Sequence, residues 1–503
     1  MKIIKKYNLE IVVFFCGAIV MVYEMVGSRV IGPYVGISTY VWTSLIGVIL
    51  ASLSAGYYFG GNLADKKPQV KPLVIFILCA SISISLATVI KDFVAIKLSS
   101  ASFSLEIKAL LLSIILFAPA SFFLGTVSPY AVKLKILSLE NAGKTAGNLY
   151  ALSTLGSIIG TFMAGFYIIP HLGSTTSLFL ISFLLIILPT LILKKTDLEI
   201  KTLLSFLVSI VIFAICIFLS SAIKISILED KDTEYNKIWV YESTYPYPNG
   251  KKTINLMNDP IGTQSAMYID EPTEIVFDYL KFYNLYEHFK TNTKETLMIG
   301  GAAYTYPTHF LDKNKKANMD VVEIDPGMTE IAKKYFQLKD SPRLSIFHED
   351  GRIFLNNNKK KYDVIFLDAY NSALSVPFHL TTIETVKKIY DSLSDDGVVM
   401  ANVISSINGE KGKFLRAEYK TFKKMFPQIL LFPTSDQKDE SMAQNIMLIA
   451  FKSDKKASLT SKDQKISAML SKVYTGEIID DAPILTDDYA PVEHYRKSML
   501  KKS

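Results

Sequence analysis

Long apolar runs dominate the chain up to about residue 223, whereas from Leu228 onward apolar and polar residues mix as in an ordinary globular protein. A membrane-spanning helix needs about 20 consecutive, mainly apolar residues. Seven segments have this character: 9–31, 39–61, 72–90, 106–128, 147–169, 175–193 and 202–222. We therefore predict an all-α, multi-span membrane domain over residues 1–223.

Short strand-like pieces follow this boundary, at 237–243, 252–257 and 263–269. The turn-forming stretches YPYPNGK and NDPIG separate them, which is typical of a small antiparallel sheet. A helical run comes next, at 272–289. We predict a small β-domain with one helix over residues 229–292.

Strands and helices then alternate regularly. Strand patterns occur at 295–300, 319–325, 344–350, 362–370 and 397–404, with helical patterns between them. This alternation predicts a parallel, doubly wound sheet, in which ligands bind at the carboxyl ends of the strands. We expect a Rossmann-like, methyltransferase-type α/β domain over 293–475, followed by a C-terminal tail, 476–503, that contains LTDDYAP.

Polar residues stand at the ends of four of these strands. They are Gly300 with Gly301, Glu323 with Asp325, Asp350 with Gly351, and Asp368. An acid often ends a strand simply because it caps the next helix. Four such positions in register nevertheless favour a nucleoside-binding domain over a purely structural one.

Each position has a physical role available to it. Gly300 and Gly301 allow a ligand to approach the backbone at a helix N-terminus. Glu323 lies 23 positions after Gly300, near the spacing of about 20 at which an acid meets ribose hydroxyls. Asp350 suits an adenine amino group. Asp368 ends an apolar strand, so its pKa should be raised, which suits a general base.

The glycine turn, IGGAAYTYP, excludes several nucleotides. It lacks the full GxGxxG pattern that cradles the pyrophosphate of NAD, and the chain has no P-loop for ATP. An adenosyl ligand without a pyrophosphate would tolerate such a turn. The turn therefore favours S-adenosylmethionine or a relative of it.

Charge and cysteine content exclude further classes. The net charge of +7 comes from scattered lysines, so we expect no nucleic-acid partner. The three cysteines, Cys16, Cys79 and Cys216, all lie in apolar runs. The globular half therefore has no cysteine-based zinc site, and we predict no metal site.

The distribution of lysines in the predicted loops gives a conflict about topology. It favours a cytoplasmic N-terminus. Seven spans would then place the globular half outside the cell, away from cytosolic co-substrates. Either one segment does not span, or the catalytic half is extracytoplasmic. We expect a multi-pass protein of the cell membrane with a cytoplasmic catalytic domain, although the lysine count argues otherwise.

The motifs IGGAAY, VVEIDPG, HEDGRIFL and YDVIFLDAYNSALSVPFHL, in this order, resemble the polyamine aminopropyltransferases, the spermidine synthase family. GTQSAMYIDEP resembles the family's N-terminal β-domain, with its glutamine at Gln264. The apolar half and ILTDDYAPVEH resemble a subgroup that carries an N-terminal membrane domain. The resemblance covers nearly the whole chain and is most specific from Leu297 to Leu380.

This resemblance implies a role for each matching residue. Glu323 would bind the ribose of decarboxylated S-adenosylmethionine, Asp350 and Gly351 its adenine, and Asp368 would accept a proton from the attacking amine. The full set implied to bind the co-substrate is Gln264, Gly300, Gly301, Glu323, Asp325, Asp350 and Gly351.

The chain departs from the family in the polyamine half of the site. The aspartate of the glycine turn is Ala303, a second acid after the catalytic one is Asn371, and the usual Tyr-His-Glu reads Phe277, Asp278, Tyr279. Other carboxylates and the faces of aromatic rings can bind a cation in place of the missing acids. We therefore predict that the amine is bound by Asp278, Tyr279, Tyr304, Tyr370 and Asn371.

These observations leave three functions open. The first is a membrane-bound aminopropyltransferase that uses decarboxylated S-adenosylmethionine and an amine such as putrescine, with Asp368 as general base. The second is a methyltransferase that uses intact S-adenosylmethionine. The third is a transporter or sensor that binds nucleosides or polyamines without turnover. The resemblance favours the first, with the lipid bilayer as a partner and a homo-oligomer as a possible assembly.

Overall fold

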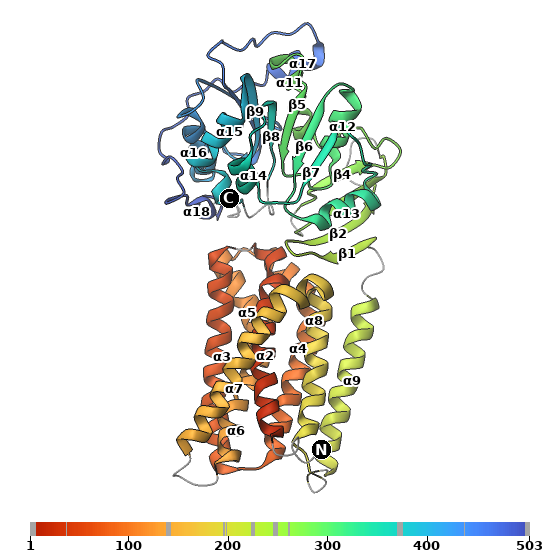
Figure 1. The fold of residues 1–503 in the computed structure, drawn as a ribbon, viewed down its shortest axis with the longest axis vertical. Coiled ribbons are helices and arrows are strands. Elements are labelled where there is room, and N and C mark those ends of the chain that lie inside the picture. The colour runs from red at the N-terminus through yellow and green to blue at the C-terminus, as the bar shows by residue number, and fades with distance from the viewer. Residues whose placement is uncertain are drawn as a thin grey trace. The chain divides into compact units, whose positions relative to one another are not determined.

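The computed structural model describes residues 7–36, 38–136, 142–194, 197, 199–222, 227–244, 250–259, 262–369, 376–436 and 438–497. The chain divides into two compact units (Figure 1). One contains residues 1–227 and 231–237, and the other contains 228–230 and 238–503. Each unit is described by itself.

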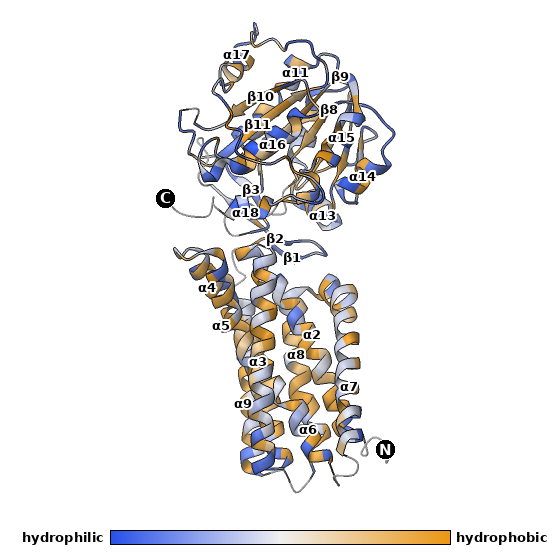
Figure 2. Ribbon diagram, turned by 90° about the vertical axis from the view of Figure 1, so that its left-hand side faces the viewer, coloured by the Kyte–Doolittle hydropathy of each residue, from blue (hydrophilic) through white to orange (hydrophobic). Residues whose placement is uncertain are grey.

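The first unit is a bundle of helices. Six of them are long and apolar enough to cross a membrane, and Figure 2 shows apolar residues along most of their length. The elements are α2 (Asn8–Val35), α3 (Thr39–Lys66), α4 (Val70–Ser99), α5 (Leu105–Gly125), α6 (Val127–Lys135), α7 (Ala142–Met163), η2 (Ala164–Ile168), α8 (Ile169–Ile187), η3 (Leu188–Leu191) and α9 (Ile200–Ala222).

One of the six apolar helices is too long for a single crossing. It runs over 50 residues, Ala142–Leu191, which at 1.5 Å per residue is about 75 Å, against a hydrocarbon core of about 30 Å. The helix breaks at Gly173, where φ is 70° and ψ is 172°. It therefore consists of two arms, residues 142–172 and 174–191, which correspond to two of the predicted spans. The described bundle thus has seven span-length arms.

The second unit begins with a four-stranded sheet in the order β1-β2-β3-β4. Its strands are β1 (Glu229–Asp232), β2 (Lys237–Ser243), β3 (Thr253–Met257) and β4 (Ser265–Tyr268). β2, β3 and β4 pair antiparallel, which confirms the predicted small sheet. The helix predicted over 272–289 is shorter, because only α10 (Asp278–Tyr283) and α11 (Tyr286–Phe289) are helical.

A seven-stranded sheet forms the centre of this unit, in the order β10-β11-β9-β8-β5-β6-β7. Its strands are β5 (Glu295–Ile299), β6 (Asn318–Val322), β7 (Leu344–Phe347), β8 (Tyr362–Leu367), β9 (Leu393–Ser405), β10 (Gln428–Pro433) and β11 (Gln444–Phe451). The strands from β9 to β7 are parallel, as predicted. The sheet also contains β10 and β11, which were not predicted, and β11 is antiparallel to both neighbours. Ten residues join β10 to β11, and this connection is too short for a parallel crossover.

Helices cover both faces of the large sheet (Figure 1). Met298, Phe366 and Met400 point to the face covered by α10, α11 and α12, and the alternate residues Leu297, Ile365 and Val399 point to the face covered by α14, α15 and α16. Burial on both faces explains the nearly continuous apolar strands. The remaining helices are α12 (Thr305–Lys313), α13 (Pro326–Tyr335), α14 (Gly351–Asn357), η6 (Phe378–Leu380), α15 (Ile383–Ser392), η7 (Glu410–Gly412), α16 (Lys413–Lys423), α17 (Gln464–Leu470) and α18 (Val492–Lys497).

Candidate active site

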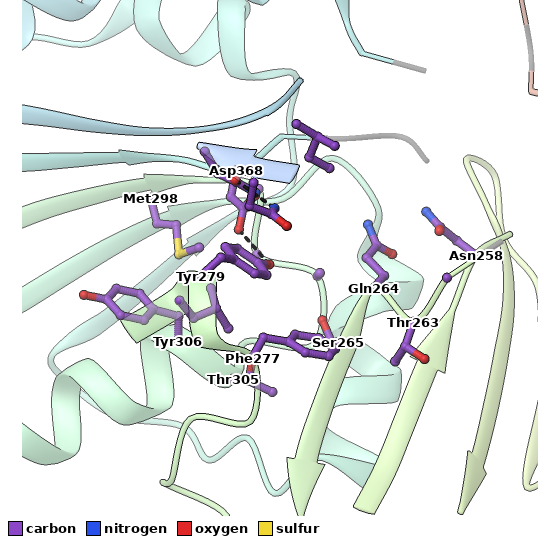
Figure 3. A pocket seen from close by; sticks show the side chains of 18 of the residues that line it. Asn258, Thr263, Gln264, Ser265, Phe277, Tyr279, Met298, Thr305, Tyr306 and Asp368 are labelled. Carbon is purple, nitrogen blue, oxygen red and sulfur yellow. Dashed lines mark hydrogen bonds between the residues drawn. The ribbon is translucent and has the colours of Figure 1, made fainter. Parts of the chain in front are cut away.

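A cavity of about 310 Å³ opens at the carboxyl ends of the central strands, between them and the small sheet (Figure 3). This is the edge at which ligands bind in open α/β sheets. Five of the residues predicted from the sequence line this cavity. They are Gln264, Tyr279, Gly300, Gly301 and Asp368.

Asp368 follows β8 and projects into the cavity (Figure 3). The Tyr279 hydroxyl donates to Asp368 Oδ2 at 3.2 Å, and the Asn402 amide donates to Oδ1 at 2.9 Å. The cavity reaches the carboxyl group, but the group lies deep within the protein, and this burial raises the pKa of Asp368 to about 6. The two hydrogen bonds oppose the shift because they stabilise the ionised form. Asp368 therefore has the properties of a base that works near neutral pH.

Gly300 allows Asp368 to come this close to the end of β5. Its φ is 94°, and a Cβ atom at this position would lie 2.4 Å from the carbonyl oxygen of Asp368. The Asp368 amide also donates to the carbonyl oxygen of Ile299 at 2.9 Å. Because any larger residue at 300 would push the two strand ends apart, this glycine is required for the close approach.

Glu323 lies against the glycine turn. Its carboxylate accepts hydrogen bonds from the backbone amides of Gly301, Ala302 and Asp325, at 2.9, 2.8 and 3.0 Å. The side chain is buried, and burial raises the pKa of Glu323 while these three bonds lower it. Glu323 is absent from the described lining of the cavity, so its predicted contact with a ribose stays a prediction. Asp325 caps α13, because its carboxylate accepts from the amide of Gly327 at 2.9 Å.

Asp350 and Gly351 form the start of α14, outside the described lining of the cavity. The Asp350 carboxylate accepts from the amide of Arg352 at 2.8 Å, and it contacts His379 Nε2 at 2.9 Å. The bond to His379 holds the pKa of Asp350 below its ordinary value. Arg352 pairs with Asp487 of the LTDDYAP segment at 2.8 Å. This segment therefore fixes α14, whose first residues are the predicted adenine site.

The residues predicted to bind the amine lie in different surroundings. Tyr279 contacts Asp368. Asp278 is exposed and pairs with Lys281 at 2.7 Å, whereas Tyr304 is buried and its hydroxyl bonds to that of Thr329 at 2.7 Å. Neither Asp278 nor Tyr304 is among the described residues that line the cavity. Tyr370 and Asn371 lie outside the described residues.

The side chain of Ala303 points away from the cavity. Ala303 is buried in an apolar cluster with residues of the small sheet that include Val240, Leu256 and Met267. The turn takes this course because Ala302 and Tyr304 have positive φ angles, 45° and 57°. Ala302 lines the cavity instead. In this turn, position 303 is thus a packing position.

Ala303→Asp is therefore expected to destabilise the fold and not to improve amine binding. A carboxylate at 303 would be buried among apolar side chains, at a cost of about 2 kcal/mol or more. Ala302→Asp is the matched variant, because aspartate tolerates a positive φ and its carboxylate would face the cavity. Thermal unfolding and the KM for the amine check both: stability falls for Ala303→Asp only, and KM falls for Ala302→Asp only. A lower KM in Ala303→Asp would contradict this assignment.

Asp259, Asn402 and Asn445 are polar residues among those that line the cavity without having been predicted from the sequence. Asn402 and Asn445 lie inside the apolar strands β9 and β11. Asparagine is depleted in strands, so each was a detectable signal in the sequence. Asp259 follows β3 and is buried, in a stretch that reads only as a turn.

The charged side chains in the described lining of the cavity are all carboxylates. This lining contains the carboxylates of Asp259 and Asp368 but no lysine, arginine or histidine. The cavity therefore suits a cationic ligand, and its described lining offers no counter-charge to a ligand carboxylate. Among the described residues, no His/Cys/Asp/Glu group fits a metal ion.

Residues 282–436 match the spermine/spermidine synthase domain family, so the C-terminal part of the chain contains a spermine/spermidine synthase domain. A polyamine aminopropyltransferase of Vibrio vulnificus is 29% identical over 173 residues, which are 34% of this chain and 56% of that protein. Polyamine aminopropyltransferase 2 of Aquifex aeolicus is 22% identical over 442 residues, which are 85% of each chain.

Among solved structures, a probable spermidine synthase from Corynebacterium glutamicum aligns with a TM-score of 0.41 at 18% identity, over 50% of this chain and 88% of that one. The spermidine synthase from Thermotoga maritima aligns with a TM-score of 0.37 at 19% identity, over 55% of this chain and 87% of that one. The chain spans about half the length of most of the curated relatives that it matches.

Proposed function

Starting from a chain whose C-terminal part contains a spermine/spermidine synthase domain, we propose that the protein transfers an aminopropyl group from decarboxylated S-adenosylmethionine to a small amine, with Asp368 as general base. The observation that carries this proposal is the cavity at the strand ends. The charged groups of its described lining are carboxylates, and one of them, Asp368, has a pKa of about 6. The relatives that carry the name polyamine aminopropyltransferase support the reaction type.

The proposed chemistry needs one proton transfer and one displacement. The acceptor enters as an ammonium and gives a proton to the Asp368 carboxylate. The nitrogen lone pair then attacks the propyl carbon beside the sulfonium, a C–N bond forms and the C–S bond breaks. The electron pair of the broken bond neutralises the sulfur, and methylthioadenosine leaves. An in-line approach requires only that both partners be held in the cavity.

The proton transfer is uphill but accessible. An alkylammonium has a pKa of about 10.4 and Asp368 about 6, a gap of about 4 units or 6 kcal/mol. Burial of the ammonium in the cavity narrows this gap because desolvation disfavours the charged amine. Burial also raises the pKa of Asp368, so the pKa values of the amine and of Asp368 become closer.

The choice of donor follows from the charge of the cavity. Intact S-adenosylmethionine carries a carboxylate, which would lie near Asp259 and Asp368 with no cationic side chain in the described lining. The decarboxylated form presents only cations, at its sulfonium and its amino group. Calorimetry on the full-length protein tests this: we expect binding of the decarboxylated form to be at least about tenfold tighter, equivalent to about 1.4 kcal/mol. Tighter binding of intact S-adenosylmethionine would favour a methyltransferase.

The pH dependence of turnover tests the role of Asp368. A base must be ionised in the free enzyme, so kcat/KM is expected to rise with pH through about 6 and then level off. A profile whose acid limb lies near pH 4, the value of an ordinary aspartate, would contradict the assignment. The measurement is a series of initial rates at saturating donor and limiting amine.

We further propose that the first unit anchors the catalytic unit to the lipid bilayer. The apolar surface and length of the helices support this. Seven arms that all cross would place Asn8 and the end of α9 on opposite sides of the membrane. A cytoplasmic catalytic unit then requires an extracytoplasmic N-terminus, against the lysine distribution. Homo-oligomerisation stays a prediction.

A further inference from the structure

Two asparagines connect Asp368 to β11, which lies two strands away from β8 in the sheet. Asn445 Nδ2, on β11, donates to Asn402 Oδ1 at 2.9 Å, and Asn402 Nδ2, on β9, donates to Asp368 Oδ1 at 2.9 Å. Asn402 and Asn445 both line the cavity, and Asn402 is 6% exposed. Their neighbours Val403 and Ile446 are buried aliphatic residues. These polar groups therefore face the base from strands that are otherwise apolar.

The order of the two bonds fixes the orientation of the Asn402 amide. An amide side chain has one donor end and one acceptor end. Because Asn445 donates to the oxygen of Asn402, only the NH₂ group of Asn402 can face Asp368. If the Asn402 amide were reversed, its NH₂ group would face the NH₂ group of Asn445, and its oxygen would face the Asp368 carboxylate. Both contacts are unfavourable in a buried site.

We infer that Asn402 and Asn445 are positioning residues that reserve one oxygen of Asp368 for the acceptor amine; this inference rests on the proposed function. Asp368 Oδ1 is occupied by an NH₂ donor that cannot accept a proton. Asp368 Oδ2 has a longer contact, 3.2 Å, to the Tyr279 hydroxyl, which can rotate away. The incoming ammonium thus meets Oδ2, on the side of Tyr279.

Several described side chains surround Asp368 or share its cavity. Tyr279 faces it from α10 and Asn402 from β9, while Asp259 lines the same cavity from the β3–β4 connection and Tyr306 from α12. The described lining contains no cationic side chain. Asp259 is the other carboxylate of the described lining, so a change in the acid limb is assigned to Asp368 where it persists in an Asp259→Asn background.

Asn445→Asp in the full-length protein tests the inference. An ionised aspartate at 445 can only accept, so the single NH₂ group of Asn402 would lie between two carboxylates, and the Asn402 oxygen would face whichever carboxylate the NH₂ group does not bind. We expect kcat/KM to fall about tenfold or more and its acid limb to move up by about one pH unit. The KM for the donor should stay within about twofold, because neither asparagine is near Glu323 or Asp350 in the hydrogen-bond network.

Two further variants keep this test decisive. Asn402→Leu removes the hydrogen bond that lowers the pKa of Asp368 and adds no charge, so it should lower kcat about threefold to tenfold and move the acid limb up, and it replaces Asn445→Asp if that variant does not fold. Asn356→Asp makes the same chemical change on the exposed face of α14 and should leave rate and profile unchanged. Retained binding of methylthioadenosine shows that each variant is folded.

The outcomes separate this inference from the proposed function. If the wild-type protein transfers no aminopropyl group to any amine, the proposed function fails and the asparagines lose their role with it. If the wild-type protein is active while Asn445→Asp keeps its rate and its pH profile, only the positioning role fails. A loss of rate in Asn445→Asp with an unchanged acid limb would also overturn the inference, because a purely structural defect gives that result.

Discussion

Asp368→Asn is expected to lower kcat by about 10²–10⁴-fold, because an amide cannot take the proton of the acceptor ammonium. The variant keeps the shape of the side chain, and its amide oxygen still accepts from Asn402. Binding of methylthioadenosine should therefore persist. The rate is measured as release of methylthioadenosine at saturating donor and amine.

Stability gives the control for this variant. The pKa of Asp368 is raised in the fold to about 6, so its ionisation destabilises the folded protein as pH rises from about 4 to 6, and this cost persists above pH 6. Removing the charge should therefore raise the unfolding temperature at pH 7.5, by the equivalent of about 3 kcal/mol, and leave it unchanged near pH 3. Full activity in Asp368→Asn, or a loss of activity together with lower stability, would contradict the role as base.

The second large effect is expected for Glu323→Gln. Its carboxylate holds the amides of Gly301, Ala302 and Asp325, and in the proposed complex it binds the ribose. In Gln the amide oxygen still accepts a hydrogen bond, but the NH₂ group replaces the other oxygen and faces a backbone N–H donor. Loss of one charged hydrogen bond costs about 1.5–3 kcal/mol, so we expect the KM for the donor to rise about tenfold to 150-fold.

The matched control is Glu330→Gln on the exposed side of α13. It removes one negative charge from the helix that follows Glu323, and it should leave the KM for the donor unchanged. Glu323→Ala is expected to be worse than Glu323→Gln, because it leaves three backbone amides buried without a carboxylate. An unchanged donor KM in Glu323→Gln would show that Glu323 only shapes the glycine turn.

Much of the fold follows from local patterns in the sequence. Apolar runs give the span-length arms, and the alternation of strands and helices gives the parallel part of the large sheet. The position of Asp368 after the apolar strand VIFLD also predicts its burial and the direction of its pKa shift. These features are local because each depends on residues within one strand or helix.

The remaining features depend on contacts that are distant in the sequence. Tyr279 and Asp368 are 89 positions apart, and Asn402 meets Asn445 only because β11 pairs antiparallel with β9. The direction of Ala303 depends on the φ angles of Ala302 and Tyr304, which alanine and tyrosine rarely adopt. Comparing motifs alone therefore treats Ala303 as a lost anchor, whereas the structure shows a packing position.

The identity of the transferred group distinguishes an aminopropyltransferase from a methyltransferase. The purified full-length protein is incubated with putrescine and an equal mixture of decarboxylated and intact S-adenosylmethionine, and the amine products are identified by mass spectrometry. We expect an aminopropyl-extended amine, formed together with methylthioadenosine and abolished in Asp368→Asn. A methylated amine with S-adenosylhomocysteine, or no amine product from a protein that binds the donor, would contradict the proposed function.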